Sequence, residues 1–495
     1  MEPDAAYLAL CARDARFDGR LFVGVTSTGV YCRPVCRVRT PRRENCRFFD
    51  TRAQAEAAAF RPCLKCRPEI APGLSQMDSS HTLAHAAAQM IEHAVHSSQS
   101  GHSGHSDHVG RCGQQRSALP ALAARLGITD RHLRRIFQAA HGVTPRDHLA
   151  TQRLLLAKQL LTDTTQPVSQ VALASGFASL RRFNAAFAER YRLNPTQLRR
   201  SGRAAPGDAP LRLAYRPPYD MAQVLGFFER RVVHGMEDVQ GLEIRRTLGW
   251  QHQGQALAGW ISLRFVPDRL EVHVYPSANL APVLGALMQR VRQALDLDAE
   301  PQRIDPVLAT LPLPSEPGTR LPGTLDSFEV AVRVILGQQV TVKAAHTLVQ
   351  RLANRFGTPV QTPWPTLNRV FPDAPTLASA DPEVMGKLGI VRQRVRAIQA
   401  LAAAVASGQL QLHRGAPLQA TLDTLRALPG VGEWTTQVIA MRALAWPDAW
   451  PASDIGLMNA LGSRDPKHIT AMAEAWRPWR AYAVMRLWHH VETSP

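Results

Sequence analysis

Residues 428–457 read LPGVGEWTTQVIAMRALAWPDAWPASDIGL: a turn almost without side chains, a tryptophan-rich stretch and then a single acid. The turn holds Gly430 and Gly432, and glycine allows backbone angles that other residues avoid and a close approach by a phosphate. Amide groups of a helix that begins after such a turn can bind a phosphate without contacting a base. Asp454 follows Gly432 by 22 residues. The stretch therefore predicts a loop that binds the phosphate backbone of a nucleic acid, followed in the sequence by one carboxylate.

The length and charge of the chain limit the class of protein. A chain of 495 residues is long enough for roughly three or four domains. Lys and Arg outnumber Asp and Glu by 18, which favours a polyanionic partner, nucleic acid first. No apolar run approaches the roughly 20 residues of a membrane-spanning helix, and the N-terminus lacks a signal-peptide pattern. We expect a cytoplasmic, nucleoid-associated protein whose partner is double-stranded DNA and not a membrane.

Two breaks in composition divide the chain. Residues 78–117 are rich in Gly, Ser and His and hold seven of the 18 histidines, but without regular ligand spacing they are interpreted as a solvated linker rather than a metal site. Residues 201–210 form a second linker, rich in Pro, Gly and small residues. After it, strand-like stretches alternate with amphipathic helices, and from Phe328 onward the pattern is helical. We predict a multidomain α+β protein with domains at 1–72, 80–200, 211–312 and 313–495.

All seven cysteines lie at or before Cys112, which favours metal or thiolate chemistry over a disulfide framework. Four of them have the spacing C-x3-C, 26 residues, C-x2-C. Two such pairs form a tetrahedral thiolate site for one Zn²⁺, and spacing alone supports a purely structural zinc knuckle. The four are Cys32, Cys36, Cys63 and Cys66, which leaves Cys11, Cys46 and Cys112 outside the filled shell.

The residues around these cysteines add a function. FDGRLFVGVTSTGVYCRPVCRVRTPRRENCRFFD and FRPCLKCRPE resemble the N-terminal zinc domain of the Ada family of adaptive-response regulators. The resemblance implies that Cys32 takes a methyl group from a methylphosphotriester in DNA. Methylation would change the formal charge of the zinc–thiolate site from about −2 to about −1 and lower its repulsion from phosphates. Six arginines would then bind DNA more tightly: Arg33, Arg37, Arg39, Arg42, Arg43 and Arg47.

Two helix-turn-helix units follow. LPALAARLGITDRHLRRIFQAAHG predicts a helix, a turn at Gly127 and a second helix capped by Thr129 or Asp130, and PVSQVALASGFASLRRFNAAFAERY repeats the design with Gly176 and Ser179. The pair resembles the AraC family of transcriptional activators, which implies an all-α domain, an operator in promoter DNA and RNA polymerase as a partner. The second helices would enter the DNA groove, with contacts from Arg131, His132, Arg134, Arg135, Arg181, Arg182 and Asn184.

The opening stretch belongs to a longer resemblance. LPGVG is typical of the helix-hairpin-helix of DNA glycosylases. Five segments in order resemble 3-methyladenine DNA glycosylase II, the AlkA family, over about residues 211–490: LAYRPPYDMAQVLGFFERRVV, GTRLPGTLDSFEVAVRVILGQQVTVKAA, LPGVGEWTTQVIAMRA, PASDIGL and WRPWRAYAVMRLWHH. The resemblance implies a TATA-binding-protein-like α+β domain followed by an all-α helix-hairpin-helix glycosylase domain.

The same resemblance assigns roles to single residues. Asp454 would be the catalytic carboxylate that stabilises the sugar as it becomes positive. Gly430 and Gly432 would contact the DNA backbone. A monovalent cation would bind backbone carbonyls near Leu425, Leu428 and Val431. The lesion or the duplex beside it would be contacted by Phe227, Gln338, Gln339, Trp434 and Trp488.

Three positions bear on the expected activity, and the last two of them depart from the family's pattern. Trp434 stands two residues past LPGVG, where glycosylases that also cut the strand carry a lysine, so no Schiff base and no lyase step are expected. Gln339 replaces a leucine that wedges into the duplex, and Val438 replaces a tyrosine of the pocket. The last two differences bear on flipping and on substrate breadth.

Three hypotheses for the function compete. The first is a methylation-triggered transcription activator whose C-terminal half removes alkylated purines of the 3-methyladenine and 7-methylguanine type. The alternative is a DNA-binding activator with a catalytically inactive glycosylase-like half, against which Asp454, Trp434 and LPGVG argue. A suicidal O6-alkylguanine methyltransferase fails because the C-terminal half has no cysteine. We therefore expect the first, a bifunctional repair protein and regulator.

Overall fold

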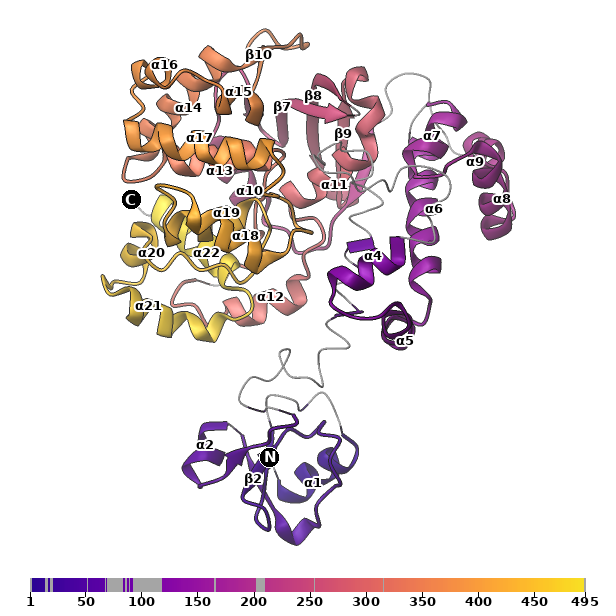
Figure 1. Cartoon of the computed structure of the whole chain (residues 1–495), viewed down its shortest axis with the longest axis vertical. Helices are drawn as coiled ribbons and strands as arrows, with labels where there is room; N and C mark the ends of the chain where they lie inside the picture. The colour runs from indigo at the N-terminus through magenta and orange to yellow at the C-terminus, as the bar shows by residue number, and fades with distance from the viewer. Residues whose placement is uncertain are drawn as a thin grey trace. The chain divides into compact units, whose positions relative to one another are not determined.

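The structure, a computed structural model, describes residues 2–13, 17, 21–50, 52–66, 68, 83–84, 87–88, 90–91, 118–163, 166–201, 210–252, 254–314 and 316–493 (Figure 1). The described residues form two compact units, one up to Thr151 and the other from Gln152 onward. Cys112, most of the His-rich linker and most of residues 201–210 lie outside the described residues. Within these ranges, no helix combines the length and apolarity that crossing a membrane requires.

A small four-stranded sheet with two helices forms the N-terminal part. Its elements are α1 (Pro3–Cys11), β1 (Phe22–Val25), β2 (Val30–Cys32), β3 (Cys46–Phe49), α2 (Arg52–Ala57) and β4 (Arg61–Pro62). The strand order is β3-β1-β2-β4, and only the β2–β4 pair is parallel. Because β2 and β4 run in the same direction, both strands end at one edge of the sheet. Cys32 and Cys63 therefore lie side by side at that edge.

Two helix-turn-helix units form the part that follows. Their helices are α4 (Ala118–Arg125), α5 (Asp130–His141), α6 (Pro145–Asp163), α7 (Val168–Ala174), α8 (Leu180–Tyr191) and α9 (Pro195–Ser201). Thr129 caps α5 by accepting the amide N–H of His132 at 3.2 Å, and Ser179 caps α8 by accepting that of Arg182 at 3.3 Å. Each capped helix buries its apolar stripe, so the paired arrangement predicted from the sequence is confirmed.

An antiparallel sheet opens the C-terminal half. Its order is β5-β9-β8-β7-β6, and residues along β5 alternate between buried and exposed, as expected for a sheet with one face on a core. The elements of this α+β part are β5 (Leu211–Ala214), α10 (Met221–Glu229), β6 (Glu237–Gln240), β7 (Glu243–His252), β8 (Gln255–Val266), β9 (Glu271–Pro276), α11 (Leu284–Ala294) and α12 (Pro301–Leu308).

The rest of the chain is almost entirely helical, as predicted. It contains α13 (Ser327–Leu336), α14 (Val342–Phe356), β10 (Thr358–Pro359), β11 (Arg369–Val370), α15 (Ala374–Ala378), α16 (Pro382–Lys387), α17 (Arg392–Ala406), α18 (Leu418–Ala427), α19 (Glu433–Arg442), α20 (Ile455–Ala460), α21 (Pro466–Ala473) and α22 (Arg480–Thr493). Two hydrophobic cores hold these helices, one around α13, α14 and α17 and one around α20–α22. Trp488 packs against both cores.

Four charged residues, three of them buried and Arg333 half-buried, join the sheet to the helical part. Arg246 on β7 pairs with Glu237 on β6 at 2.8 Å and with Glu329 on α13. Arg333 on α13 binds the same two carboxylates. Burial raises the pKa of Glu237, but the two guanidinium groups outweigh it and hold that pKa below its usual value. Opposite charges balance in this quartet, so it can fix α13 against the sheet without leaving an unpaired buried ion.

Candidate functional site

A cavity of about 1220 Å³ lies in the second unit and is lined by residues of both helical cores and of the α+β part. It brings together residues from segments that lie far apart in the sequence. Among its lining residues are Phe227, Gln338, Gln339, Gly430, Gly432, Trp434, Asp454 and Trp488, all predicted for the site. The predicted groups therefore share one cavity.

Asp454 is the N-cap of α20 and is held by both predicted tryptophans. Trp434 donates its indole Nε1–H to Oδ2 of Asp454 at 2.8 Å, and Trp488 donates its own to Oδ1 at 2.9 Å. The amide N–H of Leu457 also donates to Oδ1, at 3.1 Å. Asp454 is only 8% exposed. These bonds to a charged acceptor fix the orientation of both carboxylate oxygens.

The role of the two indoles is wider than the sequence predicted. Trp434 and Trp488 were expected as walls of the pocket, and both line the cavity, but their indole N–H groups also orient Asp454. Gly456 makes this approach possible, because a Cβ there would lie 3.0 Å from Oδ1 of Asp454 and 3.2 Å from Cδ1 of Trp488. The signal in the sequence was the indole N–H itself, which is a donor only and needs an acceptor when buried.

Phe227 lies in the wall of the cavity but is 2% exposed. The guanidinium carbon of Arg231 is 3.9 Å from the centre of its ring and that of Arg442 is 4.6 Å away. The expectation that Phe227 simply reaches into the pocket is thus incomplete, because its ring already contacts two cations. Sequence analysis did not identify either arginine, although Arg231 lies four residues after Phe227 and Arg442 eight residues after Trp434, both helical spacings.

The two hairpin glycines differ in conformation. Gly430 has φ = 75°, in the left-handed region, and a Cβ there would lie 3.3 Å from Cβ of Ala397. Gly432 is the N-cap of α19 with an ordinary φ of −90°, and a Cβ there would meet nothing within 4 Å. Of the two glycines, only Gly430 therefore uses a backbone angle that other residues avoid. Gln338 holds the turn, since its Nε2 donates to the Gly430 carbonyl at 2.9 Å and to Oγ1 of Thr435 at 2.8 Å.

Gln339, the residue at the wedge position, is exposed at the cavity with φ = 50°. A non-glycine residue in the left-handed region costs roughly 1–2 kcal/mol, so the surrounding turn must hold it there. Arg394 of α17 contributes by donating to the carbonyl of Gln338. Val438 also lines the cavity, one helical turn after Trp434.

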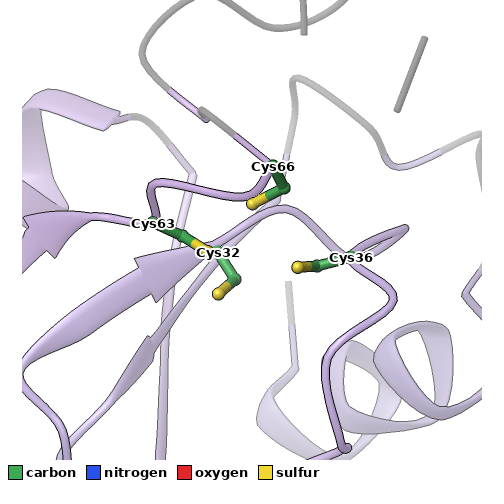
Figure 2. Close-up of side chains that lie close together, drawn as sticks. All are labelled: Cys32, Cys36, Cys63 and Cys66. Carbon is green, nitrogen blue, oxygen red and sulfur yellow. The ribbon is translucent and has the colours of Figure 1, made fainter. Parts of the chain in front are cut away.

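Four cysteines converge at the edge of the small sheet (Figure 2). The Sγ atoms of Cys32, Cys36, Cys63 and Cys66 all lie within 4.8 Å of one another, close to the roughly 3.8 Å edge of a tetrahedral zinc–thiolate shell. Hydrogen bonds from neighbouring thiols raise the pKa of Cys32 and lower that of Cys36 to about 2. Four buried sulfur donors in this arrangement fit Zn²⁺. Cys46 is apart from it and donates to the carbonyl of Arg42 at 3.3 Å.

The arginines predicted around this site are not equivalent. Arg33 is fully buried, and its backbone N–H donates to Sγ of Cys66 at 3.5 Å. Arg43 pairs with Asp4 at 2.9 Å. Two of the six predicted arginines therefore already have contacts within the domain. The other four are exposed: Arg37, Arg39, Arg42 and Arg47.

The predicted groove-contacting arginines of both helix-turn-helix units are on exposed faces. Arg134 pairs with Asp130 of its own helix at 2.8 Å, and Arg135 lies 3.0 Å from Nδ1 of His132. The exposed set comprises Arg131, Arg134, Arg135, Arg181, Arg182 and Asn184. Their helices present these side chains on the side opposite to the buried apolar stripe.

Four family models match successive parts of the chain. The metal binding domain of Ada matches residues 5–69, a helix-turn-helix domain 122–201, the AlkA N-terminal domain 210–326 and the HhH-GPD superfamily of base excision DNA repair proteins 332–481. A probable bifunctional transcriptional activator/DNA repair enzyme AlkA of Mycobacterium tuberculosis is 38% identical over 99% of this chain and 96% of its own length.

Two further relatives each match one part. DNA-3-methyladenine glycosylase 2 of Escherichia coli is 33% identical over 56% of this chain and 96% of its own length. The bifunctional transcriptional activator/DNA repair enzyme Ada of the same organism is 32% identical over 29% of this chain and 34% of its own length. The match along nearly the whole of both chains decides the assignment: this chain belongs to the AlkA family of bifunctional transcriptional activator/DNA repair enzymes, with an Ada-type zinc site and a glycosylase domain.

Proposed function

We propose that the cavity hydrolyses the N-glycosidic bond of purines alkylated at N3 or N7, of the 3-methyladenine and 7-methylguanine type. The observation that carries the proposal is the Asp454 carboxylate, held by two indole N–H groups inside a cavity beside the hairpin. Such a base is cationic before the reaction, so its bond to the sugar is weak and needs no strong acid. Asp454 would stabilise the sugar as it becomes positive and orient the water that bonds to C1′ while the base leaves.

The faces of Trp434 and Trp488 suit a cationic base. An aromatic face attracts a desolvated cation by roughly 1–2 kcal/mol, and both indoles line the cavity. The nucleotide must leave the duplex to reach Asp454, and Gln339 on its exposed turn would occupy the vacated position. The reaction would stop at hydrolysis, because Trp434 occupies the lyase position and no described residue that lines the cavity is a lysine.

DNA would be held at sites that do not depend on base sequence. Amides at the N-terminus of α19, beside Gly430 and Gly432, would bind a phosphate. The carbonyls of Leu425, Leu428 and Val431 would hold a monovalent cation that bridges to it. Exchange of K⁺ and Na⁺ for a bulky quaternary ammonium ion at constant ionic strength should then weaken DNA binding. Arg39 and the arginines of α5 and α8 would contact DNA from the regulatory half, which would act on RNA polymerase.

Asp454→Asn tests the enzymatic proposal. We expect single-turnover release of 3-methyladenine to fall on the order of 10²–10³-fold or more, because the lost charge matters most in the transition state. Lesion binding should change far less than excision, since asparagine is also a good N-cap, although its amide nitrogen cannot accept one of the two indole N–H groups. Asp465→Asn is the matched control, because Asp465 caps α21 through the amide of Lys467.

Two results would contradict this proposal. One is a mutant that excises at nearly the wild-type rate, which would show that Asp454 is not the catalytic carboxylate. The other is a wild-type complex trapped on abasic DNA by borohydride, which would reveal a Schiff base and therefore a lyase.

We further propose that Cys32 is a single-use methyl acceptor. The Sγ–CH₃ bond would form as the O–CH₃ bond of a methylphosphotriester breaks, which leaves a phosphodiester anion in the DNA. Bound Zn²⁺ would keep the thiol deprotonated. Mass spectrometry after incubation with methylphosphotriester DNA should find one added methyl group on Cys32. Cys46→Ser should accept it equally well. Methylation of Cys46, or none in zinc-loaded protein, would overturn the assignment.

A further inference from the structure

One face of α19 runs along the cavity. Trp434, Val438 and Arg442 are spaced by four residues, and all three line the cavity. A helix rises about 1.5 Å per residue, so successive members of this row are about 6 Å apart. Helical side chains also lean towards the helix N-terminus, which directs Arg442 back towards Val438. The row therefore begins at Trp434, which binds Asp454, continues with the apolar side chain of Val438 and ends at the guanidinium of Arg442.

Arg442 is a cation with spare donors. Its Nη2 donates to the Gly323 carbonyl at 3.0 Å, while its buried Nε has no hydrogen-bond partner. Among the described residues no carboxylate forms an ion pair with Arg442, because the nearby Glu237 and Glu329 are bound by Arg246 and Arg333. Burial lowers the pKa of Arg442 to about 9, which still leaves it protonated at neutral pH.

In the proposed complex, Arg442 would face the edge of the flipped purine that lies farthest from the sugar. In the proposed complex the sugar lies beside Asp454. The base attached to that sugar would then extend along this row of side chains towards Arg442. Guanine-type bases carry the acceptor O6 at that edge, whereas adenine-type bases carry an N6 amine, which is a donor. A guanidinium can only donate, so it can bond to O6 and not to the N6 amine.

We propose that Arg442 is a specificity-determining residue that favours alkylated 6-oxopurines, such as 7-methylguanine, over alkylated 6-aminopurines, such as 3-methyladenine. This inference rests on the proposed glycosylase activity and adds a preference within it. Val438 gives the middle of the row no polar group, which leaves Arg442 as the member of this row that can distinguish the two edges.

Arg442→Met and Arg442→Lys test the inference. Methionine keeps much of the side-chain length and removes both charge and donors, whereas lysine keeps a charged donor. Single-turnover release of 7-methylguanine and 3-methyladenine is measured from the same methylated duplex. The ratio of the 7-methylguanine rate to the 3-methyladenine rate is then independent of the amount of active protein. A hydrogen bond from a charged group is equivalent to roughly a 10- to 100-fold change in rate. We expect the ratio to fall by about that factor in the methionine variant and by less in the lysine variant.

The outcomes separate the inference from the activity on which it rests. An equal fall in both rates would show that Arg442 only supports the fold, and no change in either rate would show that it does not contact the base. Either result overturns the inference while the glycosylase proposal stands. Release of neither base by the wild-type protein would overturn the glycosylase proposal itself.

Discussion

Gly430 and Gly432 stand two residues apart in one turn and lack a side chain for different reasons. Gly430 has a backbone angle that favours glycine, whereas Gly432 has an ordinary angle and open space around it. The first glycine therefore shapes the turn. The second leaves room at the N-terminus of α19, where a phosphate is proposed to bind.

Alanine at each position should separate these roles. Gly430→Ala should lower the thermal stability of the helical part by roughly 1–2 kcal/mol and weaken DNA binding as well. Gly432→Ala should leave the unfolding temperature unchanged and still weaken DNA binding, because its methyl group would occupy the space of the phosphate. Calorimetry and binding to abasic duplex DNA measure the two effects. Wild-type affinity in Gly432→Ala would argue against a phosphate at this position.

At the scale of elements, local signals were predictable and contacts between distant segments were not. Thr129 and Ser179 have the residue types and spacing of helix caps, and both cap their helices. The four-cysteine cluster also followed from spacing alone. The pairing of Arg246 with Glu329 joins residues 83 positions apart. No local sequence pattern predicts that Arg246 is buried or that Glu329 is its partner, since charged residues usually lie at the surface.

The candidate site shows the same limit. Asp454 could be predicted because a family motif surrounds it. That two indoles bind its oxygens could not, because Trp434 and Trp488 lie on different helices and tryptophan is usually explained by burial. Arg442 was overlooked because the sequence alone does not show that the end of α19 lies beside Phe227. Helical spacing supplied the direction of its side chain but not its neighbours.

At the scale of the whole molecule, the two proposed chemistries occupy separate parts of the chain. All seven cysteines lie at or before residue 112, whereas Asp454 and its partners lie far beyond. A methyl group on Cys32 should therefore change DNA binding by the regulatory half without changing base excision.

Methylated protein should bind duplex DNA roughly 2- to 10-fold more tightly than unmethylated protein at about 0.02 M salt, because one negative charge near the phosphates is lost. The difference should shrink at about 0.2 M salt, where the field is screened. Dissociation constants of both forms at the two salt concentrations measure the effect, with Cys32→Ser as a form that cannot be methylated. Equal affinities at low salt would remove electrostatics as the cause of activation.

The indole bonds to Asp454 have an optical consequence. All nine tryptophans lie between residues 250 and 488, so tryptophan emission of the intact chain comes from the glycosylase half alone. Two of the emitters are Trp434 and Trp488, whose excited states respond to a neighbouring carboxylate and are quenched by a base that stacks on them. Arrival and departure of a flipped base would then change the tryptophan emission of the unlabelled protein during a single turnover. Methyl transfer to Cys32 would leave this emission unchanged.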